Sequence, residues 1–217
     1  MDNPSAFGLV ITDENGKITK FIEKPKSEEI ISDTINAGVY VFQPEVLEEI
    51  PSGKNVSVEK ETFPQILEEG KEMFGYVHYG YWLDVGTIDK FKKANFDVLD
   101  GKISLAYQKS ERNIDVDSSS NVPGDISVDG KLVVGKNVMV KNGVKIKGKV
   151  IVGEGCFVGE NCEIENSIIF RKTVIGNNCK IEDSIIGSEV IIKDNCYIKN
   201  MSLADRSLIY DFTKSGE

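Results

Sequence analysis

The chain has 217 residues, of which 40% are hydrophobic and 28% charged, and its net charge is −9. These values are typical of a soluble protein of one or two domains, and the acidic balance argues against binding nucleic acid or an anionic membrane. No stretch approaches the roughly 20 apolar residues that span a bilayer. Four cysteines and no secretory signal predict free thiols in the reducing cytoplasm.

Residues 7–101 have the pattern of alternating strands and helices. The segments Phe7–Thr12 and Ile18–Glu23 are predicted strands, joined by an Asp-Glu-Asn-Gly turn. A polar loop leads to a third predicted strand, Thr34–Phe42. Proline favours the first turn of a helix, so a short helix is predicted over Pro44–Glu49.

Two further helices and one strand are predicted before residue 101. Ser57 is placed to cap a helix that runs to about Glu69, with acidic residues in its favourable first turn. A strand is predicted over Met73–His78, and Thr87 is placed to cap a helix to about Leu99. Residues 102–121 are mostly polar and are expected to form a linker.

A six-residue repeat dominates residues 122–204. Gly, Asn, Asp and Lys fill the positions between the repeated apolar residues, and residues 205–217 are expected to be a tail. The register is expected to slip by one after Phe170, which is placed in phase, and again between Ile181 and Ile186. The residues in phase before the first slip are Val122, Val128, Val134, Val140, Ile146, Val152, Val158 and Ile164.

This period defines a parallel β-helix. Each unit is a short strand and a corner, where Gly or Asn accepts unusual backbone angles. Three units close a triangular coil, and stacked coils about 4.8 Å apart bury the inward column. The spacing does not fit an α-helix, and the repeats predict four to five coils. The pattern resembles the hexapeptide family of left-handed β-helices, and the hand rests on that resemblance.

All four cysteines fall at the inward small-residue position of a repeat. Cys162, Cys179 and Cys196 are 17 residues apart and are expected to stack in the core. A zinc site is disfavoured because no closely spaced cysteine pair is present. A hexapeptide acyltransferase is also disfavoured, because acyltransferases of this family use a β-helix histidine and His78 precedes the repeats.

The front half resembles the sugar-1-phosphate nucleotidyltransferase family. Its motifs occur in order: Asn-Pro-Ser-Ala-Phe-Gly at 3–8, Glu-Lys-Pro at 23–25, Ile-Asn-Ala-Gly at 35–38, Ser-Val-Glu-Lys-Glu-Thr-Phe-Pro at 57–64 and Gly-Tyr-Trp-Leu-Asp-Val-Gly-Thr at 80–87. The fourth motif is most similar to the mannose-1-phosphate guanylyltransferase branch. The resemblance implies a partial α/β, Rossmann-like nucleotidyltransferase domain over residues 1–101, followed by the β-helix.

The resemblance also implies roles for particular residues. Lys24 is expected to contact the sugar-1-phosphate, Asp84 to hold Mg²⁺, and the remaining residues to line the substrate pocket. Phosphoryl transfer requires this combination of a cation, a metal carboxylate and polar groups. The residues expected in the pocket are Gly8, Glu23, Asn36, Gly38 and Glu59.

Each residue also has a purely structural interpretation. Lys24 and Pro25 are also compatible with a surface turn. Asp84 is also compatible with a partner for the helix that starts at Thr87. Glu59 also suits the acidic first turn of a helix. The ordered set of motifs, rather than any single residue, favours the functional interpretation.

The family's glycine-rich loop, Gly-x-Gly-Thr-Arg, does not occur in these residues. We therefore expect a C-terminal fragment of such an enzyme, inactive alone, whose complete form uses a sugar-1-phosphate, a nucleoside triphosphate and Mg²⁺. A homo-oligomer is also expected, since β-helices offer flat faces. The alternative is a non-catalytic regulatory or oligomerisation subunit.

Overall fold

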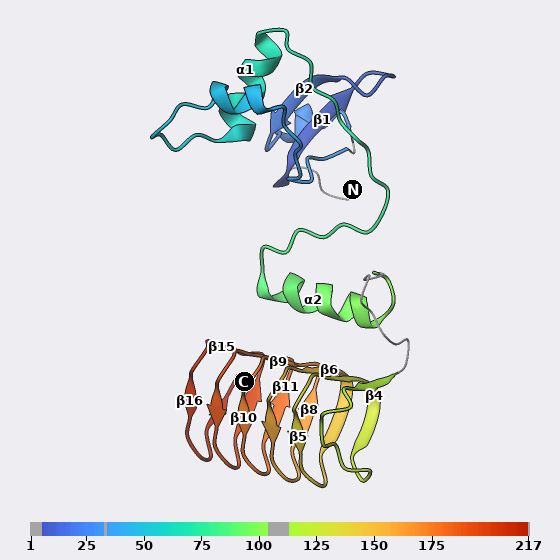
Figure 1. The fold of residues 1–217 in the computed structure, drawn as a ribbon, viewed down its shortest axis with the longest axis vertical. Helices are drawn as coiled ribbons and strands as arrows, with labels where there is room; N and C mark the ends of the chain where they lie inside the picture. The colour runs from blue at the N-terminus through green and yellow to red at the C-terminus, as the bar shows by residue number, and fades with distance from the viewer. Residues whose placement is uncertain (1–5, 33, 104–112, 217) are drawn as a thin grey trace. The chain divides into compact units, whose positions relative to one another are not determined.

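The computed structural model describes residues 6–32, 34–103 and 113–216 (Figure 1). The chain divides into two compact units, Met1–Trp82 and Leu83–Glu217. Among the described residues, none of the helices has the length and apolar character needed to cross a bilayer.

The first unit is built on an antiparallel hairpin of β1 (Gly8–Thr12) and β2 (Ile18–Glu23), as predicted. Gly16 supplies the left-handed turn residue, with φ at 80°. The carboxylate of Asp13 accepts hydrogen bonds from the backbone N–H groups of Asn15 and Lys17, both at 2.9 Å. The tight turn therefore fixes the register of the hairpin.

Short helical segments complete the first unit. The predicted helix after Gln43 forms as a 3₁₀ helix, η3 (Pro44–Glu49). The helix predicted from Ser57 forms in two parts, a π-helical turn η4 (Val58–Thr62) and α1 (Phe63–Glu68). The Ser57 hydroxyl accepts a hydrogen bond from the N–H of Lys60 at 3.3 Å, so the predicted cap is confirmed. A further 3₁₀ turn, η2, spans Ser27–Glu29.

The predictions of strands over Thr34–Phe42 and Met73–His78 are wrong. Each segment makes only an isolated bridge, between Ile35 and Leu9 and between Phe74 and Lys17. The apolar and β-branched pattern is present in both, but a strand also needs a partner along its length. Within the part of the chain that the structure describes, neither segment has such a partner.

In the second unit, α2 (Ile88–Leu99) packs on the β-helix. Thr87 caps it as predicted, accepting a hydrogen bond from the N–H of Lys90 at 3.3 Å. The rings of Phe91 and Phe170 lie 6.0 Å apart. α2 was expected to belong with the front half, but the boundary between the compact units falls before it.

Two lysines hold the C-terminal end of α2 against the β-helix. Lys149 and Lys131 donate hydrogen bonds to Asp100 at 2.6 and 3.3 Å, and Lys131 also donates to the carbonyl of Leu99 at 2.7 Å. These cations suit the negative end of the helix. Hydrogen bonds from the lysines hold the pKa of the Asp100 carboxyl below its usual value.

The repeats form a parallel β-helix of about six turns. The estimate of four to five coils is wrong because strands at 114–116, 208–209 and 214–215 extend the stack beyond residues 122–204. The strands are β3 (Ile114–Val116), β4 (Ser127–Val134), β5 (Met139–Val140), β6 (Lys145–Val152), β7 (Phe157–Val158), β8 (Glu163–Glu165), β9 (Ile168–Ile169), β10 (Val174–Ile175), β11 (Lys180–Glu182), β12 (Ile185–Ile186), β13 (Ile191–Ile192), β14 (Tyr197–Lys199), β15 (Ser202–Leu203), β16 (Leu208–Ile209) and β17 (Lys214–Ser215).

The coil shortens from 18 to 17 residues at Ile164, which pairs with Ile181. The missing residue falls near Asn166, which takes the left-handed corner with φ at 43°. The next inward residue is therefore Ile169, which is fully buried, whereas Phe170 is 36% exposed. The prediction that Phe170 keeps the inward phase is wrong, because the slip occurs before it.

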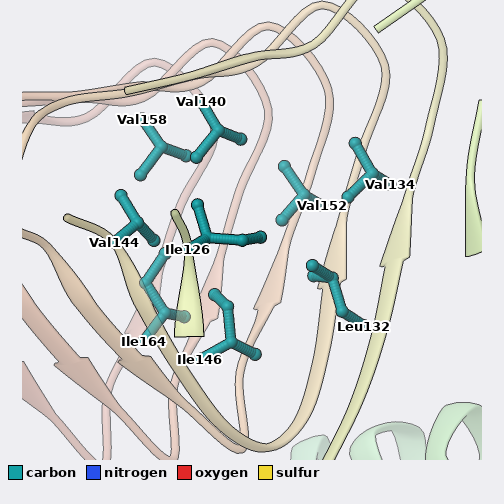
Figure 2. A pocket seen from close by; sticks show the side chains of 9 residues that line it. All are labelled: Ile126, Leu132, Val134, Val140, Val144, Ile146, Val152, Val158 and Ile164. Carbon is teal, nitrogen blue, oxygen red and sulfur yellow. The ribbon is translucent and has the colours of Figure 1, made fainter. Parts of the chain in front are cut away.

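The interior of the β-helix is mainly apolar, with the buried hydroxyls of Ser167, Thr173 and Ser184 among the aliphatic side chains. A gap of about 10 Å³ lies inside the first coils, large enough for at most one water. Figure 2 shows the side chains that surround it pointing inward from successive coils. We interpret it as a packing gap in the stacked core. Its lining residues are Ile126, Leu132, Val134, Val140, Val144, Ile146, Val152, Val158 and Ile164.

All four cysteines are buried free thiols in this core, which confirms their predicted placement. The thiols of Cys162, Cys179 and Cys196 each donate to a backbone carbonyl at 3.0 Å, in successive coils. Burial raises the pKa of the Cys156 and Cys196 thiols, so both remain protonated. They act as small core residues.

Candidate functional site

The hairpin of the first unit brings three of the predicted site residues together. Gly8 pairs with Glu23 across the hairpin. A Cβ at Gly8 would lie 2.8 Å from Oε2 of Glu23 and 3.4 Å from Cβ of Asn36, so only glycine leaves room for the carboxylate. The carbonyl of Gly8 accepts a hydrogen bond from the N–H of Asn36 at 2.7 Å. A carboxylate and an amide thus share one small area.

A hydrogen-bonded chain extends this area to Glu59 through Tyr40. The amide nitrogen of Asn36 donates to the Tyr40 hydroxyl at 2.6 Å, and that hydroxyl donates to Oε1 of Glu59 at 3.0 Å. The other amide atom, Oδ1 of Asn36, accepts from the N–H of Gly38 at 3.0 Å. Three predicted substrate residues are therefore connected to a fourth, Asn36: Gly8 and Gly38 directly, and Glu59 through Tyr40.

Sequence reasoning missed Tyr40. Its ring packs edge-on against Phe63 at 5.0 Å and lies parallel to Phe42 at 5.8 Å. The signal was the alternation after Gly38, in which every second side chain turns inward while Val39 and Val41 remain 83% and 98% exposed. The aromatic cluster fixes the ring, and the ring fixes the hydroxyl.

The pKa shifts of Tyr40 and Glu59 are consistent with these hydrogen bonds. Burial raises the pKa of the Tyr40 hydroxyl, and Glu59 adds to the effect. A backbone N–H lowers the pKa of Glu59, and the hydroxyls of Tyr40 and Ser57 contribute. At neutral pH, Tyr40 is therefore a neutral donor and Glu59 an ionised acceptor.

Lys24 follows β2 directly and has an unusual backbone. Its φ is 49°, in the left-handed region that is rare for lysine and disfavoured before proline. Its side chain is exposed, while Pro25 behind it is buried. Among the described residues, none forms an ion pair with its ammonium group. A strained backbone that presents a free cation is typical of a binding position.

Asp84 belongs to the other compact unit, Leu83–Glu217. Its Oδ2 accepts a hydrogen bond at 3.0 Å from Nζ of Lys90, which lies in the first turn of α2. This contact matches the interpretation of Asp84 as a partner of the helix start. Across residues 6–32, 34–103 and 113–216, no three His, Cys, Asp or Glu side chains are arranged to hold a metal.

Comparison with protein families assigns both halves of the chain. Residues 1–101 match the family described as nucleotidyl transferase, and residues 111–211 match the left-handed β-helix domain of the eIF2B epsilon subunit. The fold and these matches define a nucleotidyltransferase segment followed by a left-handed β-helix. The predicted resemblance to the sugar-1-phosphate nucleotidyltransferases is confirmed for residues 1–101, and the predicted left-handed β-helix for residues 111–211.

Curated relatives carry related names. A mannose-1-phosphate guanylyltransferase of Mycobacterium tuberculosis is 37% identical over 134 residues, which cover 60% of this chain and 37% of that protein. The catalytic subunit beta of mannose-1-phosphate guanylyltransferase from Drosophila melanogaster is 43% identical over 91 residues, 42% and 24% of the two chains. A UTP–glucose-1-phosphate uridylyltransferase of Synechocystis is 38% identical over 99 residues, 46% and 26% of the two chains. The chain thus matches between a quarter and two fifths of each relative's length.

Proposed function

We propose that this chain supplies the sugar-1-phosphate side of a nucleotidyltransferase site, with mannose-1-phosphate as the favoured sugar phosphate. The observation that carries the proposal is the convergence of Gly8, Glu23 and Asn36, linked through Tyr40 to Glu59. Fixed carboxylates and an amide are suited to reading sugar hydroxyls. The names of the mannose-1-phosphate guanylyltransferase relatives support the choice of sugar.

In the proposed reaction, a phosphate oxygen of the sugar-1-phosphate attacks the α-phosphorus of a nucleoside triphosphate. The bond from the α-phosphorus to the bridging oxygen breaks, and pyrophosphate leaves. Lys24 neutralises the incoming phosphate, since its side chain is exposed and it directly follows Glu23 in the sequence. Glu23, Asn36 and Glu59 orient the sugar, because catalysis of this kind depends on positioning and on charge.

Mg²⁺ is part of the same proposal for the complete site. Asp84 offers one carboxylate, and Mg²⁺ commonly combines one or two carboxylates with substrate phosphates. When bound, the ion would neutralise phosphate charge. Lys90 occupies Oδ2 of Asp84 in this structure, so it would have to release that oxygen.

We also propose that these 217 residues bind sugar-1-phosphate without turning it over. The Gly-x-Gly-Thr-Arg loop, which the family resemblance assigns to triphosphate binding, is not among them. Incubation with mannose-1-phosphate, GTP and Mg²⁺, followed by a pyrophosphate assay, tests this part. Turnover by the purified chain would contradict it.

Calorimetry with the full chain tests the binding proposal. Mannose-1-phosphate should bind more tightly than glucose-1-phosphate or inorganic phosphate. Lys24→Met should weaken binding about tenfold, the effect of losing one charged contact. Lys20→Met is the matched control, since Lys20 is also exposed but lies within β2. No binding of either sugar phosphate, or equal losses in both variants, would refute the assignment.

The second candidate is a non-catalytic assembly subunit. It is favoured by the match of residues 111–211 to a β-helix domain of a subunit of a larger complex. An assembly subunit needs the β-helix surface but not the polar cluster around Asn36. This candidate would be favoured if the wild-type chain binds no sugar phosphate and an Asn36→Ala variant associates as strongly as the wild type.

A further inference from the structure

One face of the β-helix carries a continuous stripe of outward apolar side chains. The strands β5, β7, β10, β13 and β16 stack in one parallel sheet, and each presents one outward residue. All five residues are apolar and pair in direct register, and four of them are 40–45% exposed. This apolar ladder consists of Met139, Phe157, Val174, Ile191 and Leu208.

A neighbouring face shows what such a ladder does when it is covered. There, Ile151, Ile168 and Ile185 pair in register, also pointing outward. Figure 1 shows α2 lying along this face, and Ile168, in β9, is only 3% exposed. Contacts such as Phe91 against Phe170 hold the helix there. On this β-helix, an outward apolar ladder is therefore a docking surface.

The remaining outward face differs in chemistry. It carries ion pairs between rungs, such as Lys145 with Glu163 at 3.0 Å, and a pair between Lys180 and Glu182. Such a face is stable in water. The apolar ladder has no comparable reason to be exposed, since large contiguous apolar patches usually mark interaction sites.

We propose that the apolar ladder binds the same ladder of a second copy of this chain, with the two β-helices parallel about a twofold axis. In that arrangement, facing strands run in opposite directions, so the residue two before a rung meets the residue two after it on the partner. At the Ile191 rung these are Glu189 and Lys193, which carry opposite charges, so the twofold axis would create two such pairs. Within one chain Glu189 also pairs with Arg206 of the next rung at 3.2 Å, which leaves its second oxygen for Lys193 of the partner subunit. At the Leu208 rung they are Arg206 and Tyr210.

The antiparallel arrangement is less favourable. In that arrangement the order of the rungs is reversed between the two copies, and facing strands run in the same direction. Lys172, two residues before the central rung Val174, would then face Lys172 of the partner subunit. Like charges at that position oppose association. The sequence around the ladder therefore selects one orientation.

The size of the ladder sets the expected strength of the dimer. Five rungs at about 4.8 Å spacing give a stripe about 19 Å long. A stripe one residue wide and of this length covers less area than the roughly 800 Å² that each partner buries in a standard stable interface. The proposal therefore predicts a dimer that forms with increasing concentration, in the micromolar range or weaker.

Sedimentation equilibrium of the full chain over a wide concentration range is the first test. The wild type should pass from monomer to dimer, and Val174→Asp with Ile191→Asp should weaken the dimer on the order of a hundredfold, because each would place a charge in an apolar contact. Leu47→Asp is the control, since Leu47 is also exposed but lies in η3. The melting temperatures of all variants should stay within a few degrees.

Two results would overturn the proposal. One is a wild type that stays monomeric at every concentration. The other is a lower melting temperature for the monomeric Val174→Asp, Ile191→Asp double variant, which would show that the ladder is covered within one chain.

A charge exchange tests the orientation. Glu189→Lys and Lys193→Glu should each weaken the dimer about tenfold, since each places like charges opposite one another. The two changes together should restore the wild-type affinity within a few fold. If the double variant dimerises no better than the single ones, the parallel twofold arrangement is wrong.

Discussion

The two compact units differ in how completely they bury their apolar residues. In the β-helix, the inward residues from Leu132 to Ile198 are almost completely buried, because each coil supplies the neighbours of the next. In the first unit, Val41, Tyr76 and Tyr79 are more than 90% exposed. A repeat fold completes its own core over a short length of chain. An α/β fold depends on strands that come from distant parts of the sequence.

The largest expected effect is on the buried column. Ile181→Asp would bury a charge at a fully buried position between two coils, and should lower the free energy of unfolding by about 5 kcal/mol or abolish the cooperative transition. Val41→Asp, the same kind of change at a 98% exposed residue, should cost less than about 0.5 kcal/mol. Thermal unfolding followed by circular dichroism measures both. Equal losses would mean that the two units do not differ in packing as described.

A pair of glycines gives a finer comparison. Gly130 and Gly53 both have positive φ, at 138° and 72°. An alanine Cβ at Gly130 would lie 2.0 Å from the carbonyl oxygen of Gly148 in the next coil, whereas nothing lies within 4 Å of one at Gly53. Gly130→Ala should therefore cost about 3 kcal/mol and Gly53→Ala about 1 kcal/mol. Chemical denaturation measures the difference, and similar costs would argue against close stacking at Gly130.

The sequence predicted the β-helix well because its signal is local. A period of six fixes which residues point inward, and this prediction held for Val134 through Ile164. It failed at Phe170, because a corner formed by Asn166 removes one residue from the coil, and composition alone does not reveal which residue is lost. It also missed the polar strand Lys214–Ser215, which is placed by its neighbour β14.

The candidate site was only partly predictable. The ordered motifs located Gly8, Glu23 and Asn36, and the structure brings these together. The alternation after Gly38 marks Tyr40 as an inward residue but not as a hydrogen-bond link, because that role depends on Glu59, which comes 19 residues later. The strand predicted over Thr34–Phe42, which contains Asn36 and Tyr40, did not form, since pairing over a distance is not encoded in a short pattern.

Tyr40→Phe tests whether this connection organises the first unit. The change keeps the ring on Phe63 but removes the hydroxyl that joins Asn36 to Glu59. Loss of both hydrogen bonds should lower the free energy of unfolding by about 1–2 kcal/mol and weaken sugar-phosphate binding. Calorimetry and denaturation measure the two effects. Phe42→Leu, which alters the stack but not the hydroxyl, is the control, and equal binding losses would remove the special role of Tyr40.

The smallest expected effect concerns the charged face of the β-helix. Glu182 lies on β11, where the Lys180 ammonium, the Tyr197 hydroxyl and the charge of Lys199 hold its pKa at about 2, below the ordinary value of 4.5. Because the folded pKa is depressed, this stabilisation is fully present above about pH 4.5 and is lost as the pH falls toward 2.

Glu182→Gln should therefore lower the free energy of unfolding by about 1 kcal/mol at pH 7, since solvent screens part of the interaction. It should also remove that part of the acid sensitivity between pH 4.5 and 2. Glu165→Gln is the matched control, because Glu165 pairs with Glu182 in the register of the adjacent coil. Urea denaturation at several pH values measures both variants. If the two lose stability with the same pH dependence, the ion pairs of Glu182 do not distinguish this face from the apolar ladder beside it.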